Sequence, residues 1–505
     1  MSAELARLGG PLGALGLALL LTAPRRDLRL AGLAAWALGG IALVPYLMPE
    51  GQRALLAAAA AVGLGVAALG AVVLRRWPWA LALGALACAP ARIPVDLGEV
   101  EEANLLVPLY GVVAAAALWL GLDLIRGDQR ARELGVLAWP LAGLVAWSGL
   151  SLLWTDDLRE GSIDLLFFFL PFGLLAVCLA RLPWSRFGLH LLYAMLAAMA
   201  LVFAAVGVYQ WLTRDIFWNP KVDVGNAFAP FYRVNSVFWD PSIYGRFLVI
   251  AILATLVIAL SSARRELVVG AAALIAAIWT GLLFSFSQSS FAALIAGVLL
   301  AAAFVWRWRS AAAVGLAAVV MLTVGFSAPQ VRDNLLDQSR RGLDRATSGR
   351  YGLIEDGARI ALDHPLAGVG LGGFKRAYAD RTGLRGEEPA RAASHNTPIT
   401  VAAETGLPGL ALLVWLVAAA ILTALRLAGK RRLTGRVSLF VALGITAIAV
   451  HSLFYNAFFE DPMSWGLFAL AALTAAAVAS ASADEDEGLR ERLRSLRRER
   501  VEVGA

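Results

Sequence analysis

The chain has 505 residues, of which 59% are hydrophobic and 16% charged, and its mean hydropathy is +0.70. A soluble domain carries roughly a quarter charged residues, so this composition excludes a soluble protein, a disordered chain and a secreted disulfide scaffold. The net charge of +7 comes from basic residues spread along the whole chain, which does not indicate nucleic-acid binding. Long apolar runs instead predict an all-α integral membrane protein.

Windows of about 20 residues predict a polytopic bundle of about 14 to 15 transmembrane helices. The first run is short and resembles a signal-peptide core, but Glu4 precedes it, Arg25 and Arg26 follow it and no cleavage site is clear, so we interpret it as a helix. The spans are predicted near residues 8–22, 28–48, 53–74, 77–93, 104–122, 135–154, 162–181, 187–212, 241–260, 267–284, 288–305, 310–327, 406–426, 437–457 and 463–481.

Basic residues alternate between the connections. One set of connections holds Arg25, Arg26, Arg29, Arg75, Arg76, Arg126, Arg130, Arg132, Arg181, Arg186, Arg264, Arg265, Arg307, Arg309, Arg426, Lys430, Arg431, Arg432 and Arg436, and the C-terminal tail adds six arginines from Arg490 to Arg500. The other short connections are acidic, with Glu50, Asp96, Glu99, Glu101, Glu102, Asp156, Asp157, Glu160, Glu460 and Asp461. The positive-inside rule makes the basic set cytoplasmic and predicts an N-terminus outside and a C-terminus inside.

Two connections on the predicted outer side are long, at residues 213–240 and 328–396. The chain therefore divides into helices with the first outer loop (1–327), a large extracytoplasmic loop (328–396), C-terminal helices (397–482) and a charged cytoplasmic tail (483–505). Long loops in compact proteins usually carry a site, so we expect the function in the two outer loops.

The large loop begins as a predicted helix that contains Arg350, whose guanidinium suits bidentate contacts to phosphate or pairing with nearby acids. The sequence Asp363-His364-Pro365 should end this helix, because proline stops it. The following GVGLGG has no preceding parallel strand, so we interpret it as a structural turn and not a nucleotide site.

His395 and Asn396 lie where the large loop returns to the membrane, shortly before Glu404. An imidazole at this boundary titrates near neutral pH and can accept a proton from a substrate hydroxyl, although a structural histidine is the alternative. His451, near the outer end of its span, either joins the site or is a satisfied bundle histidine.

The first outer loop places Arg233 in an aromatic segment and Arg246 about one turn inside the next span. An arginine inside a membrane indicates function by default, but one near the interface can also extend its side chain back to water. Arg233 suits either a phosphate-binding lip or an interfacial belt.

The sequence has no metal-ligand spacing such as HExxH or CxxC, and Cys88 and Cys178 each lie inside an apolar run. The adjacent carboxylates Asp156 and Asp157 are equally explained by a role at a helix N-terminus. We therefore expect metal-free chemistry without a cofactor, in which arginine side chains and backbone donors meet the charge of any pyrophosphate.

These motifs resemble the O-antigen ligase and O-antigen polymerase superfamily of bacterial membrane glycosyltransferases. The similarity covers roughly residues 147–463 and is most specific in the large loop. There an Arg, a DHPLxGVGxGxF run, a His-Asn pair and a Glu-x-Gly-x-x-Gly helix entry are matched by Arg350, residues 363–374, His395-Asn396 and residues 404–409. The earlier segments Ser151 to Asp157 and Arg233 to Ser242 also resemble the family.

The chain departs from the family pattern at Gln288, since many members have an arginine there after a serine. Glutamine can donate a hydrogen bond to a phosphate or sugar oxygen but adds no charge. Arg233, Arg246 or Arg350 would then carry more of the leaving-group stabilisation.

The resemblance implies a GT-C-like fold in the bacterial cytoplasmic membrane. It also implies transfer of a glycan from an undecaprenyl-pyrophosphate carrier to an acceptor hydroxyl on the outer face. In this scheme His395 accepts the acceptor proton and Arg350 and Arg233 bind the departing pyrophosphate, with metal-independent inversion. Gln288, Arg246, Asn396, Glu404 and His451 are the expected substrate-binding residues.

Three alternatives stay open. A flippase of lipid-linked oligosaccharides also has a dozen or more spans, although such transporters place ionisable residues near mid-membrane, whereas the charges here cluster at span ends. A scaffold subunit would make His395 and Arg350 dispensable. Within the enzyme class, ligase, polymerase and protein O-oligosaccharyltransferase differ only in their lipid, glycan or protein acceptor.

Overall fold

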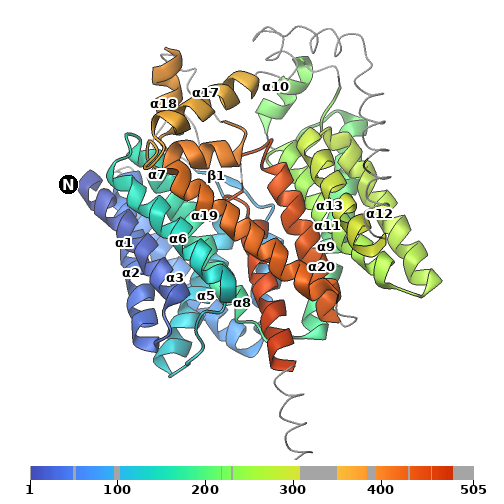
Figure 1. Cartoon of the computed structure of the whole chain (residues 1–505), viewed down its shortest axis with the longest axis horizontal. Helices are drawn as coiled ribbons and strands as arrows, with labels where there is room; N and C mark the ends of the chain where they lie inside the picture. The colour runs from blue at the N-terminus through green and yellow to red at the C-terminus, as the bar shows by residue number, and fades with distance from the viewer. Residues whose placement is uncertain are drawn as a thin grey trace, which may run out of the picture.

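The computed structural model describes residues 2–48, 53–95, 103–217, 219–228, 231–306, 315, 350–383, 394–429, 433–456 and 458–481. Within these ranges the chain is a bundle of long helices with one small β-hairpin (Figure 1). Twelve of the described helices are long and apolar enough to cross a membrane. The all-α polytopic membrane fold is therefore confirmed.

The twelve candidate spans agree with the predicted ones to within a few residues at most ends. They are α1 (Ser2–Thr22), α2 (Arg26–Leu47), α5 (Val107–Ile125), the stretch Gly135–Leu153 around α6 (Ala138–Leu150), the stretch Leu158–Ala180 formed by α7 (Leu158–Asp164), a π-helical turn (Leu165–Phe169) and α8 (Leu170–Ala180), α9 (Arg186–Thr213), α11 (Pro241–Ser261), α12 (Arg265–Ser285), α13 (Gln288–Trp306), α19 (Thr397–Ala428), α20 (Leu433–His451) and a final helix, Pro462–Ala481.

The span predicted near residues 77–93 contains a shorter helix than expected. After α3 (Arg53–Arg76), the helix α4 (Ala80–Cys88) has only 9 residues. At roughly 1.5 Å per residue this helix alone is shorter than a hydrocarbon core about 30 Å thick. The segment nevertheless runs from Trp79, which donates to the carbonyl of Pro183 after α8, to Arg92, which pairs with Glu460 before the final helix. Pro90 follows the helix, and the chain then forms the antiparallel strands β1 (Ile93–Val95) and β2 (Ala103–Leu105). The span predicted near 310–327 lies outside the described residues.

The first helix packs closely inside the bundle. A side-chain carbon added to Gly39 of α2 would lie 2.2 Å from the backbone nitrogen of Gly13 in α1. Small residues allow two membrane helices to approach at this distance, where dispersion forces hold them together. Leu17 and Leu20 of α1 are fully buried, as expected for a helix that belongs to the bundle.

The bundle has two chemically different ends. One end carries α7 and the short helices α10 (Pro220–Phe228), α17 (Arg350–Asp363) and α18 (Phe374–Thr382), and we name it the loop end (Figure 1). The opposite end, where α5 and α8 finish and α2 begins, is named the arginine end. We expect the loop end to contain the site, because it holds the described parts of both long connections singled out from the sequence.

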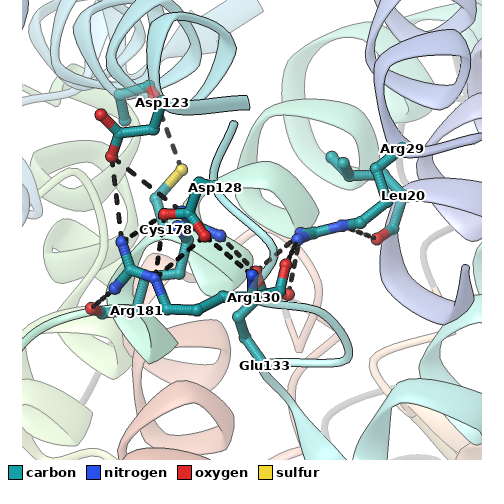
Figure 2. Close-up of polar contacts among 9 residues, drawn as sticks. Leu20, Arg29, Asp123, Asp128, Arg130, Glu133, Cys178 and Arg181 are labelled. Atoms are coloured by element: carbon teal, nitrogen blue, oxygen red, sulfur yellow. Dashed lines mark hydrogen bonds and ion pairs between the residues drawn. The ribbon is translucent and has the colours of Figure 1, made fainter. Parts of the chain in front are cut away.

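At the arginine end, three of the basic residues predicted to share one side meet in a network (Figure 2). Glu133 accepts hydrogen bonds from Arg29 and Arg181, and the Nη2 atom of Arg181 also lies 2.7 Å from Oδ2 of Asp128. Burial works against the Asp128 carboxylate, but hydrogen bonds from Arg130 and the charge of Arg181 outweigh it and lower its pKa to about 2. The network joins α2, α8 and the connection after α5.

Candidate functional site

His395 lies at the loop end, in the turn that leads into α19. Its φ of 51° is in the left-handed region, which a residue with a β-carbon rarely adopts. Asn396 caps the first turn of α19, and its side-chain amide donates to the carbonyl of Leu453, 3.0 Å away. The backbone N–H of Thr397 donates to the carbonyl of Ser452 at 2.8 Å. The half-buried His395 is thus presented by a turn that is held against the end of α20.

His451, the last residue of α20, is fully buried beneath this turn. Its Nε2 lies 3.1 Å from Oγ of Ser289 in α13 and 3.2 Å from the carbonyl oxygen of Ser242 in α11. A carbonyl can only accept, which assigns the ring proton of a neutral imidazole to Nε2. Among the described residues Nδ1 has no hydrogen-bond partner. His451 therefore connects three helices, and its Nδ1 is a buried hydrogen-bond acceptor without a donor among the described residues.

Arg246 of α11 is also buried, with 1% of its surface exposed, so it does not extend to water. Its Nε lies 2.7 Å from Oδ2 of Asp461, which immediately precedes the final helix. Both Nη atoms are buried and have no hydrogen-bond acceptor in the part of the chain that the structure describes. A buried guanidinium with unused donors is costly unless an anion or water completes it.

Arg233 connects the first outer loop to the turn before α13. Its backbone exchanges two hydrogen bonds of 2.9 Å with the side chain of Asn226 in α10. Its Nε donates to the carbonyl of Ser285, 3.2 Å away. Gln288 begins α13 three residues later and is exposed at the loop end. The structure thus places Arg233 and Gln288 at neighbouring positions around one turn.

Arg350 is the first residue of α17, and its side chain lies outside the part that the structure describes. The helix itself packs against α19, because a side-chain carbon added to Gly357 would lie 2.6 Å from Cγ2 of Ile399. A small apolar cluster completes this contact: Ile360, Ala361, Phe374, Ala402 and Ala403. The start of α17 is therefore held at the same end of the bundle as His395.

The glycine-rich segment forms a turn beside a break in α19. Gly368, Gly370 and Gly372 have φ values of 65°, 88° and 76°, which favour glycine. The backbone N–H of Gly370 donates to the carbonyl of Glu404 at 2.8 Å, just before the non-helical Gly406. These contacts agree with the predicted structural turn, which here fixes the loop against α19.

Glu404 is buried, and its Oε1 accepts from the backbone N–H of Phe374 at 3.3 Å. It lines a cavity of about 60 Å³ together with Asp164 and Glu460. Thr397 also lines this cavity, and its buried Oγ1 has no hydrogen-bond partner among the described residues. Cavities with several polar partners commonly hold ordered water. Glu404 therefore supports the glycine turn from inside instead of facing open solvent.

An ion pair beside this cavity fastens α18 to α7. The Nζ atom of Lys375 lies 2.7 Å from Oε1 of Glu160. Burial disfavours the Lys375 cation, but the Glu160 carboxylate outweighs burial and raises the pKa of Lys375. Asp157 caps the start of α7 through a 3.1 Å hydrogen bond from the N–H of Glu160, which is the helix N-terminal role considered for this acid pair. Within the described ranges, no three His, Cys, Asp or Glu side chains are placed to hold a metal ion.

Several residues around the site were not predicted to belong to it. Ser242, Ser289 and Asp461 surround Arg246 and His451, although they come from three separate segments. Asp461 was noted in the sequence only as one of the outer acids. The two serines carry no signal by themselves, since serine is common at helix ends.

Comparison with known proteins matches one segment of the chain to a family. Residues 271–414 match the family model described as O-antigen ligase. This segment includes most of α12, then α13, α17, α18 and the first part of α19, and thus Gln288, Arg350, His395 and Glu404. No curated protein matches the chain. The segment that carries the loop motif is thus similar to the O-antigen ligase family.

Proposed function

We propose that this protein transfers a glycan from an undecaprenyl-pyrophosphate carrier to an acceptor hydroxyl on the outer face of the bacterial cytoplasmic membrane. The observation that carries the proposal is the arrangement at the loop end. His395 is presented on a clamped turn, and Arg233 lies with the exposed Gln288 around the turn before α13. The family match covers part of this arrangement.

In the proposed reaction the acceptor oxygen attacks the anomeric carbon of the donor sugar. The bond between that carbon and the pyrophosphate oxygen breaks, and prenyl pyrophosphate leaves with the electron pair. His395 takes the proton of the acceptor hydroxyl, which is general-base catalysis. A single displacement of this kind inverts the anomeric centre.

The leaving pyrophosphate needs cationic and hydrogen-bonding partners because no cofactor is invoked. Arg350 and Arg233 are proposed to bind it, with Gln288 as a neutral donor. Asn396 orients the turn that holds His395. Glu404, Arg246 and His451 are buried. We propose that they support this surface from below and contact only those parts of the donor that reach into the bundle.

The test is glycan transfer by the purified protein in lipid, with undecaprenyl-pyrophosphate-linked glycan as donor and EDTA present. We expect wild type to consume the donor, and His395→Ala to be slower by about 10²- to 10⁴-fold, the usual range for a general base. His364→Ala is the matched control, because His364 is exposed at the end of α17. Loss of wild-type activity in EDTA, restored by a metal ion, would contradict the metal-independent mechanism.

A different result would favour the transporter alternative. In that case the donor lipid would move between leaflets of a vesicle without being consumed, and His395→Ala would behave like wild type. Release of free prenyl pyrophosphate together with a lengthened or newly glycosylated acceptor separates the two functions, because transport leaves the glycan bond intact.

A further inference from the structure

An apolar cavity of about 520 Å³ runs along the bundle away from the site. Its walls come from α4, α8, α9, α11, the start of α12, α20 and the final helix, Pro462–Ala481. Near the loop end it is bordered by Ile250, Pro462 and Met463, and near the arginine end by His190 and Arg436. It therefore extends across much of the membrane thickness.

The walls of the cavity suit a hydrocarbon chain and not water. Small residues such as Ala82, Ala85, Ala254 and Gly466 line the cavity, and a side-chain carbon added to Gly466 would meet nothing within 4 Å. Apolar cavities stay dry and bind apolar guests. In a membrane, a cavity of this kind is filled by hydrocarbon.

The polar groups at the loop end indicate which kind of lipid supplies the hydrocarbon in the cavity. Ile250 lies one helical turn from Arg246 on α11, and Pro462 directly follows Asp461. The cavity thus begins beside the buried Arg246–Asp461 pair, where both Nη atoms of Arg246 have no acceptor among the described residues. An anionic group above the cavity would supply that acceptor.

The opposite end offers a weaker anion site. Arg436 already donates from Nη2 to the carbonyl of Ser261 at 3.2 Å. A phospholipid of that leaflet would place its headgroup there and its chain toward the site. The unused donors of Arg246 instead favour a lipid whose anionic head is at the loop end.

We propose that this cavity holds the isoprenoid chain of the donor, with its phosphate groups at the Arg246 end. The inference rests on the proposed function, since it takes the donor to be a prenyl pyrophosphate. It adds a specificity element: the chain length of the carrier is read by α4, α11 and the final helix, away from the reacting atoms.

The first test compares donors with a long and a two-unit prenyl chain. Gly466→Phe fills the cavity. Gly270→Phe is the control, since Gly270 also has open space around it but is exposed and is not among the residues that line the cavity. We expect Gly466→Phe to lower kcat/KM for the long donor by about tenfold or more through lost burial of methylene groups. The short donor should react at the wild-type rate, and Gly270→Phe should resemble wild type with both.

Equal loss with both donors, or no loss with either, would overturn the inference while leaving glycan transfer intact. A second readout does not need activity: a photoreactive long-chain prenyl pyrophosphate without a glycan is crosslinked to the wild-type protein. We expect crosslinks in α4, α11 and Pro462–Ala481 that disappear in Gly466→Phe. Crosslinks elsewhere, or displacement of the probe by phospholipid alone, would show that another lipid fills the cavity. If wild type binds the probe there but never transfers a glycan, the proposed function fails and the binding site stands.

Discussion

The two ends of the bundle each bury arginines, but they use them differently. At the arginine end every nitrogen of the Arg29 guanidinium donates to the protein, to the carbonyls of Leu20 and Arg130 and to Glu133. At the loop end Arg246 has one partner, Asp461, and two Nη atoms without an acceptor among the described residues. A saturated buried charge holds helices together, whereas an unsaturated one leaves binding capacity for another molecule.

The largest expected effect lies at the arginine end. Glu133→Ala would leave Arg29 and Arg181 buried without their shared carboxylate, so we expect the free energy of unfolding to fall by about 3 to 5 kcal/mol. Thermal unfolding in detergent measures this loss. Asp27→Ala is the control, because the Asp27 side chain is 68% exposed and its ion pairs should contribute less than about 1 kcal/mol. Similar melting temperatures for both variants would show that this network is not structural.

The next largest effect is expected at the loop end, where we attribute the fold of the glycine turn to close backbone contacts more than to charge. A side-chain carbon added to Gly372 would lie 2.2 Å from the backbone nitrogen of Gly161, and its φ is 76°. We expect Gly372→Ala to destabilise the protein by about 2 to 4 kcal/mol, through a steric clash added to left-handed strain. Gly383→Ala isolates the strain, because Gly383 has a φ of 71° and open space, and should cost about 1 to 2 kcal/mol. Equal losses for the two variants would contradict the close packing of this turn.

The smallest effect is a pH dependence of the arginine end. The pKa of Asp128 is lowered from 3.8 to about 2, so its contribution to stability is complete above pH 3.8 and is lost as the pH falls toward 2. We expect a loss on the order of 1 kcal/mol in this window. Asp128→Asn should remove that part of the pH dependence of thermal unfolding. A wild-type profile in the variant would assign the acid sensitivity to other carboxylates.

The sequence predicted the two ends from different kinds of signal. Alternating basic connections grouped Arg29, Arg130 and Arg181 correctly, because such charges avoid the membrane interior together. The apolar run near residues 77–93 predicted a longer helix than α4, since an apolar run alone does not reveal that Pro90 and a β-hairpin follow it.

The partners in the site were less predictable than its position. Arg246 was chosen as a single residue inside a span, but its pairing with Asp461 joins positions far apart in the sequence. Likewise the contact of His451 with Ser289 exists only once α20 packs against α13. The hydrogen-bond and ion-pair partners of a buried side chain depend on tertiary packing, and the sequence alone does not specify that packing.

The most direct test of the contrast between the ends is to replace the pair Arg246 and Asp461 together. Exchanging a buried ion pair for hydrophobic residues commonly leaves stability unchanged or improved. For Arg246→Leu combined with Asp461→Leu we therefore predict a melting temperature close to wild type, together with a loss of glycan transfer of about 100-fold or more, because the unused donors are gone. A stable double variant that transfers glycan at the wild-type rate would contradict the account, since Arg246 would then be as structural as Arg29.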